Sequence, residues 1–381
     1  MKTVTIDGMP VGDGHPPRVM SVLNMSEQSG YKPSVYLDAE KAAQHIDEEL
    51  VPAGADIIDI GLQSANPKYK AKAIEKELDR LEDVAPILDY VESNVLFSLE
   101  TRYAEVAEEA IGYGFDIIND VCGFADPEMK PTVEAHDVPV IKMASPSDLT
   151  KPGALKTIDD VFAALERDGF TDRTIIDPAF GGWYDKKTFE DNWEMFRRLR
   201  EFRAFGRPIL TATNREDFLG ALAGKLDTDK QLAVSLAAAT MEVERGAHII
   251  RTHDTPETHD VVKVAHALGD NRVTQPDSPA VIELTNVSQR ELARYRSRGV
   301  ETATSNDTGP MLTFVIGDID EELQTRLCTV AREQSITAIE QDAGLYILGI
   351  PQKIKNYATA IEKGLSTASK IADRMHEAAN R

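Results

Sequence analysis

The chain contains the stretch Ala247-His248-Ile249-Ile250-Arg251-Thr252-His253-Asp254. Its apolar start predicts a β-strand, in which successive side chains alternate between faces, so Arg251 and His253 project from the same face. An arginine beside a titratable imidazole is a candidate anion site, and ligands bind at the C-terminal ends of strands in parallel barrels. The alternative is a strand that ends in a structural salt bridge, and the rest of the chain has to decide between them.

Seven other short apolar runs precede this stretch, and helical patterns lie between them. The expected strands are residues 19–24, 56–61, 95–100, 116–120, 139–143, 174–177, 208–213 and 248–253. The expected helices are residues 38–52, 70–90, 104–113, 128–136, 155–168, 188–205, 229–245 and 256–268. Alternating strands and helices indicate a parallel sheet, and eight such units in about 250 residues predict an α/β fold of the (β/α)8 TIM barrel type. A doubly wound open sheet is the alternative, but no Gly-x-Gly-x-x-Gly follows the first strand.

The pattern changes from Gln275 onward. Pro276-Asp277-Ser278-Pro279 predicts a linker, so we expect a barrel over residues 1–274 and a smaller α+β domain over residues 280–381. The expected strands of this domain are 281–287, 312–317 and 346–350, and its expected helices are 288–298, 320–334 and 353–378. We recognise no catalytic pattern in it, and its role is left open.

The composition excludes several classes of protein. The net charge of −22, from 64 acidic against 42 basic residues, repels nucleic acid and anionic membranes, so neither is expected as a partner. Two cysteines, Cys122 and Cys328, are too few for a disulfide framework or a cysteine metal cluster. No run has the length of a signal peptide or a membrane span. We therefore expect a cytoplasmic protein.

Polar residues gather where the expected barrel strands end. They are Asn24, Asp59, Gln63, Ser64, Glu100, Asn119, Asp120, Lys142, Asp177, Asn214, Arg215, Arg251 and His253. Any one of them could be a cap or a turn residue. Barrel cores favour branched apolar residues, however, so the whole set predicts a polar ligand at the C-terminal mouth.

Four segments in register with these strands resemble dihydropteroate synthase, a family of pterin-binding (β/α)8 barrels. The segments are Ala53-Gly54-Ala55-Asp56-Ile57-Ile58-Asp59-Ile60-Gly61, Asp116-Ile117-Ile118-Asn119-Asp120-Val121, Ile175-Ile176-Asp177-Pro178 and Arg251-Thr252-His253-Asp254. The resemblance covers residues 19–268. Residues 23–26, followed by 31–35, are similar to the archaeal branch of the family.

The resemblance implies a transferase of folate biosynthesis. Such an enzyme joins a 6-hydroxymethyl-7,8-dihydropterin diphosphate to an arylamine (4-aminobenzoate or a relative) and releases pyrophosphate. It implies small-molecule partners, a homodimer, and Mg²⁺ as the cofactor, bound by Asn24. The implied pterin-binding residues are Asp59, Glu100, Asn119, Asp177, Asn214 and Arg215. The implied diphosphate-binding residues are Asn24, Arg251 and His253, the arylamine-binding residues are Ser64 and Pro67, and the catalytic residues are Arg251, His253 and Glu216.

The sequence also departs from the family pattern. Residues 26–30 and 63–68 differ from the family's two loops, and the second loses an arginine that Lys68 or Lys70 could replace. Glu100 stands where the family has Asp, and Glu216 stands where it has a pterin-binding Lys. Two other functions therefore stay open. One is a pterin-dependent methyltransferase, in which Asn214 would meet pterin N5, and the other is a non-catalytic pterin-binding protein.

Overall fold

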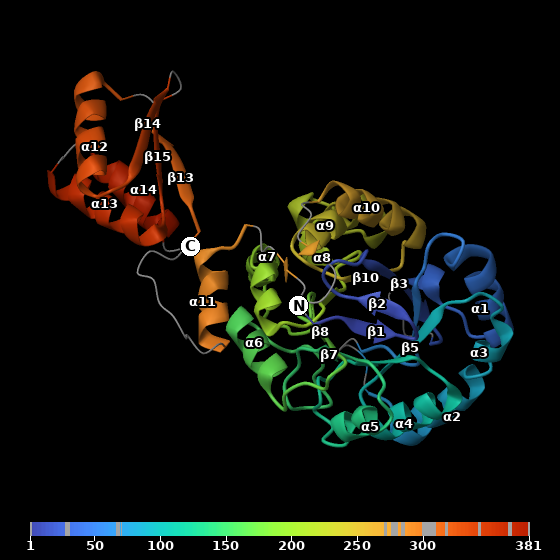
Figure 1. The fold of residues 1–381 in the computed structure, drawn as a ribbon. Coiled ribbons are helices and arrows are strands. Elements are labelled where there is room, and N and C mark those ends of the chain that lie inside the picture. The colour runs from blue at the N-terminus through green and yellow to red at the C-terminus, as the bar shows by residue number, and fades with distance from the viewer. Residues whose placement is uncertain are drawn as a thin grey trace. The chain divides into compact units, whose positions relative to one another are not determined.

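The computed structural model forms two compact units, Met1–Glu283 and Leu284–Arg381 (Figure 1). It describes residues 2–26, 31–65, 69, 71–269, 273–275, 281–282, 286–298, 310–316, 319–341, 344–364 and 368–379. The expected linker at residues 276–279 lies outside this set. None of the helices in these ranges is long and apolar enough to cross a membrane.

The first unit is built on a parallel sheet of eight strands. They are β3 (Arg18–Asn24), β4 (Ile57–Gly61), β5 (Leu96–Thr101), β6 (Ile117–Asp120), β7 (Val140–Met143), β8 (Thr174–Asp177), β9 (Leu210–Thr211) and β10 (Ile249–Thr252). Their order is β8-β7-β6-β5-β4-β3-β10-β9. A parallel bridge between Ile176 and Ile209 brings the two edge strands together, and the Ile176 amide donates to the Pro208 carbonyl at 2.9 Å. The expected (β/α)8 barrel is confirmed.

An antiparallel hairpin, β1 (Val4–Ile6) and β2 (Met9–Val11), packs against the N-terminal ends of the barrel strands. Its apolar side chains join one inward-facing residue from each strand: Met20, Ile57, Leu96, Ile117, Ile141, Ile175, Leu210 and Ile249. Sequence analysis did not predict this hairpin. Asp7-Gly8 is its signal, because both residues have positive φ (40° and 80°), as a two-residue type I′ turn requires.

Helices surround the sheet in Figure 1. They are α1 (Ala39–His45), α2 (Ile74–Val84), α3 (Ile87–Tyr90), α4 (Ala104–Tyr113), α5 (Met129–Ala135), α6 (Ile158–Glu166), α7 (Phe189–Arg197), α8 (Asp217–Leu222), α9 (Leu232–Glu244) and α10 (Thr255–Leu268). A π-helical turn, Ile46–Leu50, continues α1, and 3₁₀ segments occupy Lys32–Ser34, Leu199–Phe205 and Thr228–Lys230. The single helices expected over residues 70–90 and 188–205 are each divided in two. The first is interrupted before Ile87, where Pro86 has no amide to donate.

The second unit is a three-stranded antiparallel sheet with helices, ordered β13 (Leu312–Ile316), β15 (Gly344–Gly349), β14 (Thr337–Gln341). Its helices are α11 (Gln289–Arg298), α12 (Glu321–Glu333), α13 (Pro351–Gly364) and α14 (Ser369–Ala379). Its core contains the wholly buried side chains of Leu327, Leu345, Ile347 and Tyr357. Strand β14 was not predicted, and the helix expected over residues 353–378 is two helices. A short pair, β11 (Val273–Gln275) and β12 (Val281–Ile282), ends the first unit, so the strand expected at 281–287 is only partly described.

Candidate functional site

The inward-facing side chains of the barrel change from apolar to polar along each strand. Because side chains alternate, the residues two and four positions beyond the apolar layer face the same interior at the C-terminal mouth. From Ile249 these are Arg251 and His253, and from Ile57 the first is Asp59. The same count places Asn24, Glu100, Asn119, Asp177 and Asn214 at the mouth.

Arg251 is the centre of one side of the mouth. Its Nε donates to Oδ2 of Asp59 and its Nη2 donates to Oε2 of Glu100, each at 2.7 Å. Asp59 is wholly buried, and it also accepts hydrogen bonds from Ser98 Oγ (2.7 Å) and Asn119 Nδ2 (3.1 Å). Strands β4, β5, β6 and β10 therefore meet in one polar network.

The charges in this network stabilise one another. Burial opposes the charge of Arg251, but the carboxylates of Asp59 and Glu100 raise its pKa above the ordinary value. Burial raises the pKa of Glu100 to about 7, and the positive charge of Arg251 opposes that shift. Arg251 therefore stays a cation, and two carboxylates already compensate its charge before any ligand binds. The strand thus ends in the salt bridges of the structural alternative, and the anion site stays a prediction.

His253 is a neutral imidazole in this structure. Burial, together with the positive charge of Arg251, lowers its pKa to about 3. Its Nδ1 is buried without a hydrogen-bond partner among the described residues, while its backbone amide donates to Asn214 Oδ1 at 3.1 Å. Its ring lies 5.1 Å from the ring of Tyr31. His253 therefore offers its Nδ1 to the mouth as a neutral hydrogen-bonding group, and its role in binding an anion stays a prediction.

Arg215 lies at the rim, where its donors are already engaged. Its Nε and Nη2 form a bidentate pair with Asp254 (2.8 and 2.7 Å), and its guanidinium lies 4.6 Å from the centre of the Tyr31 ring. Asn214 Nδ2 also donates to Asp254, at 2.9 Å. The fork of Arg215 thus holds Tyr31 and Asp254 in place. Sequence analysis assigned no role to either partner: Tyr31 lies in a loop, and Asp254, which directly follows the expected strand 248–253, was not counted among the polar strand ends.

The opposite side of the mouth contains Asp177, Lys187 and Glu216. The loop after β8 folds back on itself: the Ala179 amide donates to Asp177 Oδ1 at 2.8 Å, and Lys187 Nζ donates to the Ala179 carbonyl at 3.1 Å. A Cβ at Gly181 would lie 2.8 Å from Glu216 Oε2, so this carboxyl lies against the bare backbone of Gly181. None of the three charged groups forms an ion pair within 4.0 Å in the described ranges.

Burial shifts the pKa values of all three of these groups toward neutral pH. It raises the pKa of Asp177 to about 6 and that of Glu216 to about 7, where the neighbouring Asp217 adds to the shift. It lowers the pKa of Lys187 to about 8, although Glu216 and Asp177 oppose this. Lys187 is only 9% exposed and was not predicted. Its signal in the sequence is a lysine in the loop that directly follows the Asp177 strand.

Three residues of the predicted polar set do not belong to the mouth: Lys142, Asp120 and Gln63. Gln63 accepts a hydrogen bond from the Lys72 amide at 2.8 Å and donates one to Glu77 of α2. Lys142 is one position out of phase with inward-facing Ile141. Its Nζ donates outside the barrel to the carbonyl of Leu165 in the last turn of α6 (3.0 Å) and to that of Gly169 after it (2.9 Å). Asp120 accepts the amides of Cys122 and Phe124 within its own loop. Lys142 therefore holds the end of α6, and Asp120 shapes a turn.

The groups assigned to magnesium and the arylamine lie near the ends of β3 and β4. Asn24 Nδ2 donates to Ser34 Oγ at 2.9 Å, which turns its carbonyl oxygen toward Gly61. No group of three acidic, histidine or cysteine side chains that could hold a metal occurs in the described part of the chain. Ser64 lies partly buried in the loop after β4, and Pro67, Lys68 and Lys70 lie outside the described residues.

The chain was compared with known families and curated proteins. Residues 20–253 match the family of pterin binding enzymes. The chain is 34% identical to a probable bifunctional folylpolyglutamate synthase/dihydropteroate synthase of Halobacterium salinarum, over 70% of this chain and 34% of that protein. It thus spans about a third of the length of this relative. It is 30% identical to the dihydropteroate synthase of Bacillus subtilis, over 66% of this chain and 88% of that one.

Solved structures give the same result. The dihydropteroate synthase of Coxiella burnetii, in complex with pteroic acid, matches with a TM-score of 0.58 and 31% identity, over 70% of this chain and 98% of that one. The dihydropteroate synthase of Thermus thermophilus, in complex with 4-aminobenzoate, matches with a TM-score of 0.58 and 29% identity, over 70% and 100%. Together with the eight-stranded barrel and its polar mouth, these matches lead to one conclusion: the chain belongs to the family of pterin binding enzymes.

Proposed function

We propose that the chain is a transferase that condenses a 6-hydroxymethyl-7,8-dihydropterin diphosphate with an arylamine and releases pyrophosphate. The observation that carries the proposal is the polar mouth, where acceptor groups suited to a pterin lie beside a cation suited to a diphosphate. The likeness to dihydropteroate synthases over the whole barrel supports it. The proposal also includes 4-aminobenzoate or a relative as the arylamine, and a cytoplasmic homodimer, whose size light scattering can test.

Asp177 and Asn119 would hold the pterin. Asp177 uses one carboxylate oxygen for the Ala179 amide, and its other oxygen can accept a pterin donor. Asn119 gives its Nδ2 to Asp59, so its carbonyl oxygen remains for a second donor. The 2-amino group and the ring N–H of a pterin are such a pair of donors. Asp59 and Glu100 would act by positioning Asn119 and Arg251.

Arg251, with His253, would bind the diphosphate. As the bond between the methylene carbon and the diphosphate oxygen breaks, negative charge grows on the leaving group and the arylamine nitrogen forms the new bond to carbon. A cation that is already in position lowers the free energy of this charged state. The carbonyl oxygen of Asn24 fits a Mg²⁺ ion bound mainly by diphosphate and water oxygens, which would supply further neutralisation of charge.

Glu216 and the loop after β4 would act on the acceptor side. The pKa of Glu216 is raised to about 7 and that of nearby Lys187 is lowered to about 8. The carboxyl of Glu216 can therefore donate or accept a proton near neutral pH. Ser64 and Pro67 remain proposals for the arylamine contacts. Arg215 would act indirectly, because its fork is held by Asp254.

Asn214 counts against the methyltransferase alternative. In that function its amide would have to meet pterin N5. Here its Nδ2 donates to Asp254 and its Oδ1 accepts from the His253 amide, so both ends of the amide are engaged by protein groups. The same contacts make Asn214 a positioning residue in the proposed transferase.

Calorimetric titration with 6-hydroxymethyl-7,8-dihydropterin diphosphate, with and without Mg²⁺, tests the proposal. A transferase should bind the diphosphate more tightly with Mg²⁺ and should release pyrophosphate when an arylamine is added. A methyltransferase should bind the pterin equally well with or without its diphosphate. Binding without any release of pyrophosphate, for every arylamine tried, would contradict catalysis.

A further inference from the structure

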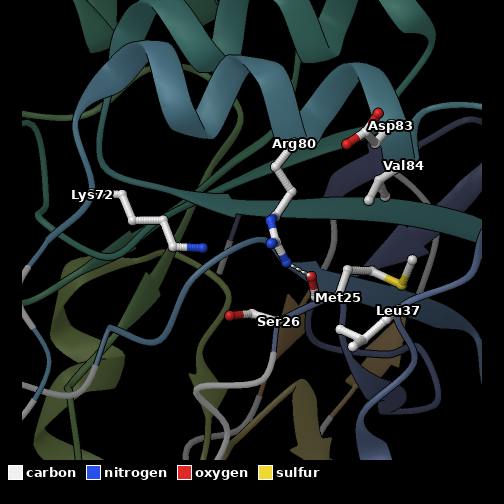
Figure 2. A pocket seen from close by; sticks show the side chains of 7 residues that line it. All are labelled: Met25, Ser26, Leu37, Lys72, Arg80, Asp83 and Val84. Atoms are coloured by element: carbon white, nitrogen blue, oxygen red, sulfur yellow. Dashed lines mark hydrogen bonds between the residues drawn. The ribbon is translucent and has the colours of Figure 1, made fainter.

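A cavity of about 320 Å³ lies outside the barrel interior, between the end of β3 and helix α2 (Figure 2). Met25 and Ser26, which directly follow β3, line one wall, and Lys72 and Arg80 line another. In Figure 2 the side chains of Lys72 and Arg80 extend into the same space. Met25 packs in the outer core with α1 and α2, whereas its neighbour Asn24 faces inward, so the cavity is separate from the mouth.

The two cations in this cavity bond to backbone carbonyls. Arg80 Nη1 donates to the Met25 carbonyl, and Lys72 Nζ lies 3.4 Å from the Leu62 carbonyl. Neither side chain forms an ion pair within 4.0 Å with any carboxylate that the structure describes. The cavity lining also contains the exposed carboxylate of Asp83, which forms no ion pair with either cation. Two cations against one acid leave the lining with a net positive charge in a chain with 64 acidic and 42 basic residues, which points to an anionic ligand.

The cavity is also preformed. The Lys72 amide donates to Gln63 Oε1 at 2.8 Å, and the Lys72 carbonyl accepts from the Tyr103 hydroxyl at 2.9 Å. Gln63 in turn donates to the buried carboxyl of Glu77 on α2, the helix that carries Arg80. The backbone of Lys72 is therefore tied to the helix that carries Arg80, which reduces the entropy lost when a ligand binds.

We propose that this cavity is a phosphate-binding site, distinct from the diphosphate residues of the mouth. Two fixed positive charges suit a multiply charged phosphate better than a carboxylate, and an arginine fork matches phosphate oxygens. Free inorganic phosphate and pyrophosphate share this chemistry. Only pyrophosphate as the ligand rests on the proposed function, because pyrophosphate would be the product of the transferase.

Calorimetric titration of the full chain with inorganic phosphate, pyrophosphate and 4-aminobenzoate, at low salt, tests the site. Lys72→Met and Arg80→Gln should each weaken phosphate binding about tenfold, the effect of one lost charge-assisted contact. Asp83, an exposed acid at the rim of the cavity, opposes an anion, so Asp83→Asn should tighten binding about twofold. Tighter binding of pyrophosphate than of phosphate would identify the product as the ligand, and the reverse would identify the free ion.

Lys76→Met is the matched control, because it removes the same charge from an exposed position on the same helix outside the cavity wall. It should change affinity by no more than about twofold. Arg251→Ala should leave phosphate binding in place, which separates this site from the mouth and from the proposed catalysis. The proposal is overturned if wild type binds no phosphate, if Lys72→Met and Arg80→Gln bind it as wild type does, if Lys76→Met loses as much, or if the variants lose 4-aminobenzoate instead. Thermal unfolding of each variant confirms that it is folded.

Discussion

The two sides of the barrel mouth differ in whether their charged side chains are paired with each other. On the side of β4, β5 and β10, Arg251 is paired at 2.7 Å with both Asp59 and Glu100. On the side of β8 and β9, Lys187 and the Asp177 carboxylate bond to backbone groups of Ala179, and Glu216 lies against Gly181. The first side satisfies its charges from within the protein. The second side has charged groups that a ligand can still satisfy.

This difference separates positioning from binding. A paired network keeps its geometry without a ligand, and removing one member leaves the others uncompensated. Groups with pKa values near 6, 7 and 8, as Asp177, Glu216 and Lys187 have, can change protonation when a ligand binds. We therefore expect mutations on the first side to cost stability and mutations on the second side to cost affinity.

Asp177→Ala should have the largest effect on pterin binding. Two pterin donors would face a site with one acceptor fewer, and an unsatisfied buried group costs about 1–3 kcal/mol, more with charge, so affinity should fall by about 100-fold or more. The fold should survive, because the carboxylate bonds only to the Ala179 amide within its own loop. Calorimetry with 6-hydroxymethylpterin measures the loss. Asp116→Ala, which removes a carboxylate that accepts the Phe97 amide at the other end of the barrel, is the control; unchanged affinity in Asp177→Ala would refute the assigned pocket.

Arg251→Ala should lower stability as well as diphosphate binding. It leaves Asp59 and Glu100 uncompensated in a buried network, so we expect the free energy of unfolding to fall by about 3 kcal/mol. The donors of Arg251 that are not paired with acids would contact the diphosphate and not the pterin ring. Binding of the pterin diphosphate should therefore weaken far more than binding of the free pterin. Urea unfolding and paired titrations measure the two effects. Equal weakening of both ligands, with stability lost, would make Arg251 purely structural.

Glu216→Gln should have the smallest effect, and its sign depends on pH. The folded pKa of Glu216 is raised to about 7 from an ordinary 4.5, so the stability of its neutral form is fully present below pH 4.5 and is lost as pH rises through about 7. Glutamine stays neutral throughout. The variant should therefore match wild type near pH 5 and exceed it by about 1–3 kcal/mol at pH 8. Urea unfolding at both pH values measures this, and a difference that does not change with pH would mean that Glu216 is solvated.

The sequence predicted the barrel well because its strands are short, branched and regularly spaced. Strand alternation, counted from the apolar layer, also separates Arg251 and Asp59 from Lys142, whose parity puts it outside. That count needs the position of the layer, which the structure supplied. The hairpin at Asp7-Gly8 was missed although its turn signal is present, because each of its strands has only three residues.

The electrostatics of the site could not be predicted in the same way. The neutrality of His253 follows from burial beside Arg251, and the pairing of Arg251 with Glu100 joins residues 151 positions apart. Lys187 reaches the mouth from within a loop, where no periodic pattern applies. Such contacts depend on how the strands meet in the barrel, and the sequence of each strand alone does not contain them.

The proposed activity is tested most directly by pyrophosphate release from 6-hydroxymethyl-7,8-dihydropterin diphosphate with Mg²⁺ and a panel of arylamines that includes 4-aminobenzoate. We expect wild type to release pyrophosphate only when an amine is present, and Asp177→Ala to release almost none at the same substrate concentration. Mass spectrometry of the product should show the pterin joined to the amine. If wild type forms no such product with any amine, or if Asp177→Ala forms it as fast, the assigned function or the assigned pocket is wrong.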